Sequence, residues 1–365
     1  MIVAKALKNL VAWVLNPLIA VMILLHCNLA QAKAQLSLYH AEVSAEQTQQ
    51  QWQREALQQV LIRVTGQPDI IQQPQIRSEL ANAASYVKQF EAVRTEQANN
   101  VRVLLDAQRI QQLLRERQIP IWDGQRPELL FWIVEQQGNE RQFVRRNDSP
   151  WLQSLQEALN SQALPYTLPL YDIDDLLNLT ETDVWVGFWQ QIELASYRYK
   201  AHQIVVLLLE PSANENSTGW SLTALRQQDD KILRDELDAN NEQALMQQYV
   251  ALLSQQLTQQ YAILLTPNQQ QQAVLQIHGV STLADAVTLE RRLAGMLGVS
   301  RVQITQHAPA TTVFSLTLQI TPEQLLQSLA FEPNLRQRPA AERWPADSAA
   351  AAMQSLLAEF DYTRP

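Results

Sequence analysis

Cysteine is almost missing from this chain: it occurs once in 365 residues, at position 27. Everything after Cys27 is therefore unable to form disulfides, to offer a thiolate nucleophile or to ligate zinc through sulfur. A chain of this length buries enough apolar surface to fold without disulfide support.

Glycine and catalytic sequence motifs are also scarce. Only eight glycines occur, and the phosphate-loop, dinucleotide-loop and nucleophile-elbow patterns are absent. The five histidines show no spacing typical of metal ligands. The sequence thus identifies no catalytic residue, no metal ligand and no cofactor. It favours a non-enzymatic protein, although an enzymatic activity stays open.

Basic residues are outnumbered, 28 against 37 acidic ones, which gives a formal net charge of −9. Such an acidic chain is repelled by phosphate backbones and by anionic lipid surfaces. We therefore expect neither nucleic acid nor a specific membrane lipid among its partners.

The N-terminus has the layout of a secretory signal peptide. Lys5 and Lys8 precede an apolar run over residues 10–25, and no acidic residue occurs before Glu42. The small-residue pattern Ala30-Gln31-Ala32 then predicts that residues 1–32 are removed, with a second candidate cut after Ala34. Removal would also discard Cys27 and leave a periplasmic protein.

The alternative is a retained inner-membrane anchor at residues 10–25. A membrane-spanning helix needs about 20 apolar residues, and this run is shorter. It is also interrupted by Asn16-Pro17, and proline disfavours a continuous helix. Acylation of Cys27 is disfavoured because His26, which is bulky, precedes it.

Residues 33–125 predict an N-terminal α+β domain. "LSLYHAEVS" is typical of an opening strand. In "WQREALQQVLIRVTG" the apolar residues recur at helical spacing up to a stop at Gly66. The positions 76, 80, 84, 87 and 90 indicate a second helix or a helix running into a strand. "NVRVLLD" and "AQRIQQLLRER" follow as a strand and a helix, which suits a small antiparallel sheet with helices on one face.

Residues 126–266 predict a central α/β domain. "LLFWIV" (129–134) and "IVVLLL" (204–209) are continuous apolar runs, typical of strands covered on both faces in a partly parallel sheet. "WSLTAL" alternates, as an edge or half-exposed strand does. A long helix is expected from about Asn241 to Tyr261.

Residues 267–331 predict a compact β-α-β-β-α module. Its elements are "AVLQIHGV", "TLADAVTLERRLAGMLG", "RVQITQ", "VFSLTLQI" and "PEQLLQSLA". The strand from Val313 alternates, which directs Phe314, Leu316 and Leu318 inward. The fold class is thus α/β and α+β in a three-part chain.

Residues 332–365 predict a proline-containing tether that carries a short helix, "SAAAAMQSLLAEF". Met353, Leu356, Leu357 and Phe360 would form its apolar side. Such a helix can dock in a groove of another protein, or it can be a frayed or self-packed tail.

Four segments resemble a known family: "ALQQVLIRVTG", "LPLYDIDDL", "DVWVGFWQQIELASYRYKAHQIVV" and "GVSTLADAVTLERRLAGMLGV". In this order they are similar to proteobacterial envelope proteins grouped as domain-of-unknown-function family 2066, over roughly residues 35–330. The resemblance implies an exported protein of a Gram-negative bacterium and implies no chemistry. The opening helix also resembles the N-terminal module of flagellar and lipoprotein assembly factors of the envelope.

Asp172, Asp174 and Asp175 cluster in "YDIDDLLNL". They could bind a hard cation or serve as a carboxylate pair, but no glycine-assisted turn accompanies them. Aspartates in this position also favour the first turn of a helix, where they accept from backbone N–H groups. We interpret them as helix-capping residues.

The segment that follows is rich in aromatic residues and supplies the candidate ligand site. Aromatic side chains can stack on sugar rings, yet the spacing 185, 188/189, 192 is also that of a helix face in a core. The candidate ligand-binding residues are Asp183, Trp185, Trp189, Arg198 and His202.

These observations favour a non-enzymatic binding or scaffold protein of the Gram-negative cell envelope. It would bind another envelope protein through its small sheet domains or its C-terminal helix. The alternative is a protein that binds or hydrolyses a cell-wall saccharide or peptide, with Asp183 and the nearby aromatic residues forming the cleft.

Overall fold

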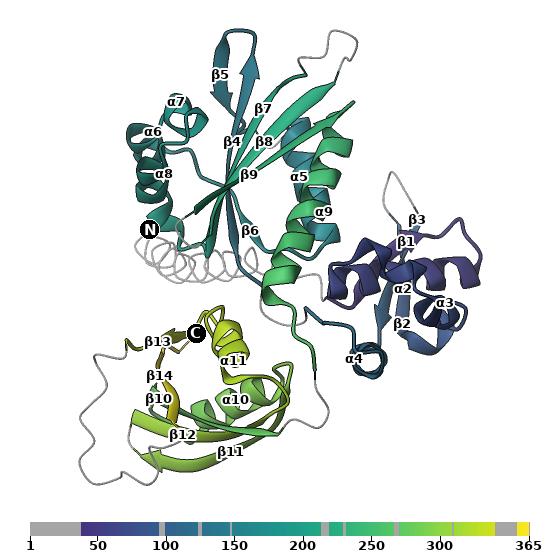
Figure 1. Ribbon diagram of the computed structural model, residues 1–365, viewed down its shortest axis with the longest axis vertical. Helices are drawn as coiled ribbons and strands as arrows, with labels where there is room; N and C mark the ends of the chain where they lie inside the picture. Colours follow the sequence, from purple (N-terminus) through teal and green to yellow (C-terminus); the bar gives the residue numbers. More distant parts are fainter. Residues whose placement is uncertain are drawn as a thin grey trace, which may run out of the picture. The chain divides into compact units, whose positions relative to one another are not determined.

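The computed structural model describes residues 38–94, 99–122, 126–146, 148–212, 219–228, 231–265, 270–308, 310–339 and 356–364. The predicted signal at 1–32, the alternative anchor at 10–25 and Cys27 lie outside these residues. No helix within the described ranges is both long enough and apolar enough to cross a membrane. The described fold contains three sheets with helices packed on them, the predicted mixture of α/β and α+β structure (Figure 1).

The first sheet is antiparallel, in the order β1-β3-β2, as predicted. Helix α2 covers it with Leu57, Val60, Leu61 and Val64, all fully buried. Gly66 ends α2 in the left-handed conformation, at φ 60°, and its N–H donates to the carbonyl of Ile62. The elements are β1 (His40–Ser44), α2 (Gln49–Thr65), η1 (Pro68–Gln72), α3 (Pro74–Leu80), η2 (Ala83–Tyr86), β2 (Val87–Arg94), β3 (Asn99–Leu105) and α4 (Ala107–Glu116).

The second sheet is mixed, in the order β5-β4-β7-β8-β9, with the short β6 also on β4. Strands β4 and β7 pair in parallel, which confirms the partly parallel sheet expected from the two continuous apolar runs. The elements are β4 (Leu129–Gln137), β5 (Glu140–Phe143), α5 (Pro150–Ser161), β6 (Tyr166–Thr167), α6 (Ile173–Asn178), α7 (Glu181–Trp185), α8 (Trp189–Ser196), η3 (Tyr197–Tyr199), β7 (Gln203–Pro211), β8 (Trp220–Gln228), β9 (Lys231–Ala239) and α9 (Glu242–Tyr261).

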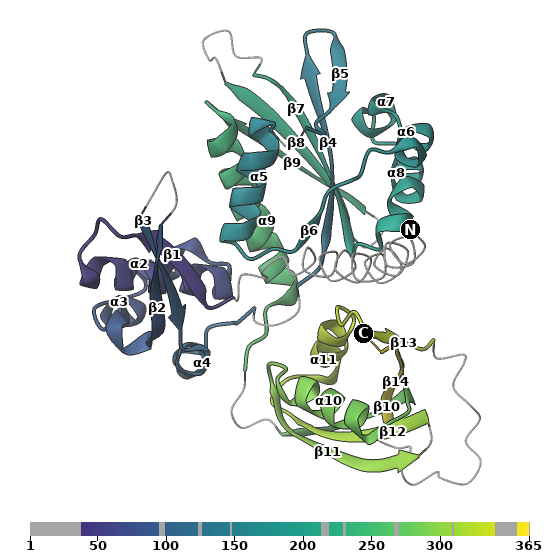
Figure 2. The same ribbon diagram turned by 180° about the vertical axis from the view of Figure 1, so that it is seen from behind.

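Helices cover both faces of this central sheet, as Figures 1 and 2 show from opposite sides. Along β4, Leu129, Phe131 and Ile133 join a core with α5 and α9, whereas Leu130 and Trp132 join a core with α7 and α8. Successive side chains of a strand point to opposite faces, so a strand buried on both sides is apolar throughout.

The alternating "WSLTAL" segment is half-exposed, one of the two predicted alternatives, but it is not an edge strand. It lies in β8, which pairs with β7 on one side and β9 on the other. The edge on this side of the sheet is β9, whose sequence "KILRDELDA" contains five charged residues. Charged side chains suit an edge strand because they discourage pairing with further strands.

The third sheet has the order β11-β12-β10-β14-β13. Its first five elements follow the predicted β-α-β-β-α order, and Phe314, Leu316 and Leu318 are fully buried as expected. The elements are β10 (Gln271–Val280), α10 (Leu283–Ala294), β11 (Val299–Ala308), β12 (Ala310–Leu318), α11 (Pro322–Leu329), β13 (Leu335–Gln337) and β14 (Leu356–Tyr362).

The predicted C-terminal helix is wrong over its described part. Residues 356–362 form strand β14, which pairs in parallel with β10 and antiparallel with β13. Ala358, Phe360 and Tyr362 enter the core and Asp361 pairs with Arg338. The segment 332–365 is therefore not a tether throughout, because β13 and β14 complete the third sheet. Residues 340–355, including Met353, lie outside the described ranges.

Candidate functional site

The helices α6, α7 and α8, with the short η3, form one layer on the central sheet. The inner side of this layer is apolar: Leu179, Val184, Ile192 and Ala195 are buried against β4, β7 and β8. These helices have only five to eight residues each. Helices this short are not stable alone, so tertiary contacts must hold them.

A polar cluster fixes the start of α6 to η3. The Asp172 side chain caps α6 by accepting from the Asp175 N–H at 3.1 Å. Arg198 donates to both Asp172 oxygens, at 2.7 and 2.9 Å, and to Asp175 Oδ1 at 3.2 Å. Asp175, only 2% exposed, also accepts from the N–H of Tyr171 and the hydroxyl of Tyr199. This bidentate geometry locks the two ends of the layer together.

The charges of this cluster shift the pKa values of its members. The hydrogen bond from Arg198 holds the pKa of Asp172 below its ordinary value, and Asp172 in turn raises the pKa of Arg198. Burial, reinforced by the hydrogen bond to Asp175, raises the pKa of Tyr199 to about 12. The ion pair is therefore charged, and the tyrosine neutral, across the physiological pH range.

An aromatic cluster lies beneath the same layer. Trp132 of β4 donates from Nε1 to Ser196 Oγ at 2.9 Å. Tyr171 and Tyr199 meet its ring edge-on, with centroids 5.6 and 6.3 Å away. Trp132, Tyr171 and Tyr199 thus serve as core on the inner side of the layer.

The outer side of the layer is unusual because it too is apolar. Tyr197 is 86% exposed, Leu177 79% and Ile173 76%. Of the twelve large apolar side chains that are exposed in the described residues, eight lie between residues 170 and 197. We call these eight the outer apolar surface: Leu170, Ile173, Leu176, Leu177, Val186, Phe188, Leu194 and Tyr197.

The predicted site residues at the start of the aromatic segment have structural partners. Asp183 accepts from the N–H and the hydroxyl of Thr180, at 3.0 and 2.6 Å, and completes the capping box of α7. Trp185 is half-buried, and the guanidinium of Arg141 lies 4.5 Å from its ring centroid.

The remaining predicted site residues are dispersed. Trp189 donates from Nε1 to Glu193 and Gln227, whereas Arg198 belongs to the Asp172 cluster. His202 accepts at Nδ1 from the Glu128 N–H at 3.0 Å, and its ring packs edge-on against Phe331. Burial lowers the pKa of His202. Each of the five candidate residues thus has its own partner in the fold.

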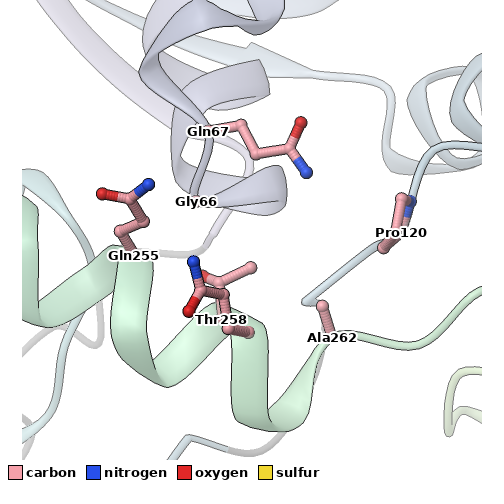
Figure 3. Close-up of a pocket in the computed structure, with 7 residues that line it drawn as sticks. Gly66, Gln67, Pro120, Gln255, Thr258 and Ala262 are labelled. Carbon is pink, nitrogen blue, oxygen red and sulfur yellow. The ribbon is translucent and has the colours of Figure 1, made fainter.

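A cavity lies elsewhere in the described residues. It measures about 360 Å³ and lies between the C-terminal ends of α2 and α9, where Gln67, Pro120, Gln255 and Thr258 line it (Figure 3). Its lining includes no titratable side chain, so it supplies no acid or base for catalysis. The described residues also contain no group of three His, Cys, Asp or Glu side chains placed to hold a metal ion.

The sequence predicts the capping role of Asp172 but not the outer apolar surface. The signal is present in "LPLYDIDDLLNL": Ile173, Leu176 and Leu177 are too many for the one buried stripe that a six-residue helix offers, and Leu170 precedes the helix. Composition alone does not tell which of them face solvent.

One family model matches the chain, over residues 32–123, and it is described as a domain of unknown function (DUF8605). It covers the first sheet and its helices and differs from the family that the sequence resembles over 35–330. No curated protein and no solved structure matches the chain. The candidate site therefore rests on its own geometry.

Proposed function

We propose that this chain is a non-enzymatic binding protein of the Gram-negative cell envelope, and that it docks another protein on the outer face of α6–α8. The outer apolar surface carries this proposal: eight large apolar side chains are exposed within 28 residues of sequence. Exposed apolar surface is unfavourable in water, and where it is concentrated it marks a site of association.

The rigidity of the layer supports docking over a frayed segment. Arg198, Asp172 and Asp175 tie α6 to η3, and Ser196 holds α8 to Trp132 of the sheet. A surface held in place before binding loses less conformational freedom on association.

The location is proposed from the N-terminal sequence, with residues 1–32 removed and the remainder in the periplasm. Mass spectrometry of the protein purified from cells tests it directly. A mature N-terminus at Lys33 or Gln35 supports export with cleavage, whereas a chain that retains Met1 favours the anchor at residues 10–25.

The docking role is tested by photo-cross-linking in cells of the source species. A photoreactive phenylalanine analogue replaces Leu177 or Tyr197 in the surface, and Leu283 or Ile232, also exposed, serve as controls. We expect a discrete protein adduct from the first pair only, and its loss when Phe188→Ser is added. Equal labelling from all four positions would contradict the proposal.

A further inference from the structure

The segment that carries the outer apolar surface is also acidic, and the exposed Arg198 and Lys200 follow directly after it. Residues 170–197 contain no lysine or arginine and six acidic residues: Asp172, Asp174, Asp175, Glu181, Asp183 and Glu193. Of these, Asp172 and Asp175 are compensated from within the layer by Arg198. Asp174 is only 3.9 Å from the same guanidinium, yet its side chain remains 78% exposed.

Of the four carboxylates that remain, Asp183 is held in the capping box of α7, and the other three are exposed or half-exposed. Asp174 follows Ile173 on α6, and Glu193 precedes Leu194 on α8, where both carboxylates are exposed. Glu181, in the first turn of α7, is half-exposed. A docked partner would thus meet apolar groups and negative charge on the same surface.

The shape of the surface favours a helix as the bound element. On α6 the exposed residues Ile173, Leu176 and Leu177 follow helical spacing, and on α8 and η3 so do Leu194 and Tyr197. Helices α6 and α8 contact each other, and both views show them on the same side of the sheet (Figures 1 and 2). Helices expose side chains and no free strand edge, so the surface suits a partner's helix face and not an added strand.

From these observations we infer that the partner presents an amphipathic helix with a leucine-rich face flanked by lysine or arginine. This inference rests on the proposed docking function and specifies its partner. Opposite charges around an apolar contact favour the correct partner and speed its association. An anionic lipid surface has the wrong sign for this site.

Calorimetry with two synthetic helices tests the inference on the purified chain. Both peptides have about 18 residues, or five turns, and the same leucine face. One has lysine and the other glutamate on its polar face. We expect the lysine peptide to bind, more weakly as salt concentration rises, and the glutamate peptide not to bind.

Two matched sets of variants assign that binding to the surface. Neutralising three surface carboxylates should weaken the binding of the lysine peptide about tenfold. Each exposed charge pair contributes little, but three of them together account for a change of this size. Neutralising three exposed carboxylates elsewhere removes the same net charge and should leave the affinity unchanged. The surface set is Asp174→Asn, Glu181→Gln and Glu193→Gln; the control set is Glu46→Gln, Glu210→Gln and Glu323→Gln.

The possible failures are distinguishable. If both peptides bind equally and Leu177→Ser with Leu194→Ser weakens both, the surface docks helices but the basic partner is wrong. If the two charge sets weaken the lysine peptide equally, its binding is general electrostatic attraction and the inference is overturned. If neither peptide binds, the helix inference is overturned, and the cross-linking experiment still decides whether the surface docks a protein.

Discussion

The two helical layers on the central sheet differ in the side chains that they expose to solvent. Helices α5 and α9 bury one apolar face each, and none of their described residues is a large exposed hydrophobe. Glutamines such as Gln247 and Gln255 occupy their polar positions. Helices α6–α8 also bury an apolar side, but they present a second one to solvent.

The difference lies in what holds each layer. The twenty residues of α9 supply long apolar packing against the sheet, and Gln256 adds hydrogen bonds to Arg226 of β8 and Asp235 of β9. The short helices of the other layer depend in addition on Arg198, Asp172 and Asp175. Because these polar contacts lie inside the layer, the outer face of α6–α8 is not needed to hold the helices. We propose that this outer face binds a partner.

Truncation of a buried leucine should separate the layers most clearly. Leu155 of α5 is fully buried, whereas Leu177 of α6 is 79% exposed. Leu155→Ala should lower the free energy of unfolding by about 2–5 kcal/mol, because it removes packed atoms and leaves a cavity. Leu177→Ala should change it by less than about 0.5 kcal/mol. Urea unfolding of both variants measures this, and a similar loss in the two would mean that α6 is buried.

The sequence predicts the layers themselves well, because the signals are local. The continuous apolar runs predict strands β4 and β7, which are covered on both faces. Asn241 predicts the start of α9, and its side chain caps the first turn of that helix. The strand β14 was missed because Leu356 and Phe360 fit helical spacing, while Ala358, Phe360 and Tyr362 fit strand spacing equally well. The segment forms a strand because it pairs with the edge of β10, a contact that the local sequence does not reveal.

The candidate site was harder to predict than the fold. The sequence predicts Arg198 as a candidate ligand-binding residue but not its carboxylate partners, which lie 23 and 26 residues earlier in the chain. Which of several nearby carboxylates an arginine meets depends on how α6 and η3 pack. In the same way, the outer apolar surface follows from the orientation of α6, which its apolar sequence leaves undetermined.

Removing the buried carboxylate tests whether the polar cluster holds the outer layer. Asp175→Ala leaves the N–H of Tyr171, the hydroxyl of Tyr199 and part of Arg198 without their acceptor. An unsatisfied buried group costs about 1–3 kcal/mol, and we expect a loss of that size. Asp174→Ala, at the exposed neighbouring position, is the matched control.

The region that Asp175→Ala destabilises is as informative as the loss of unfolding free energy. Hydrogen–deuterium exchange should accelerate over residues 173–199 in Asp175→Ala and stay unchanged over α9. Faster exchange across both layers would show that the cluster supports the whole sheet, and the contrast between the layers would then be wrong.

The smallest expected effect is a pH dependence at His202. His202 connects η3 to β7, whereas α5 and α9 contain no histidine. Burial lowers its pKa from the ordinary value of 6.5, and its Nδ1 accepts from the Glu128 N–H, which only a neutral nitrogen can do. The unfolded chain therefore takes up a proton at higher pH than the folded chain.

Stability from this residue is fully present above pH 6.5 and declines as the pH falls from there towards the folded pKa. Urea unfolding at a series of pH values around 6.5 should show this decline. In His202→Asn the amide oxygen can still accept from Glu128 but does not titrate, so the decline in this range should disappear. If His202→Asn keeps the same decline, other groups cause it, and the acid sensitivity does not distinguish this side of the sheet from the α5–α9 side.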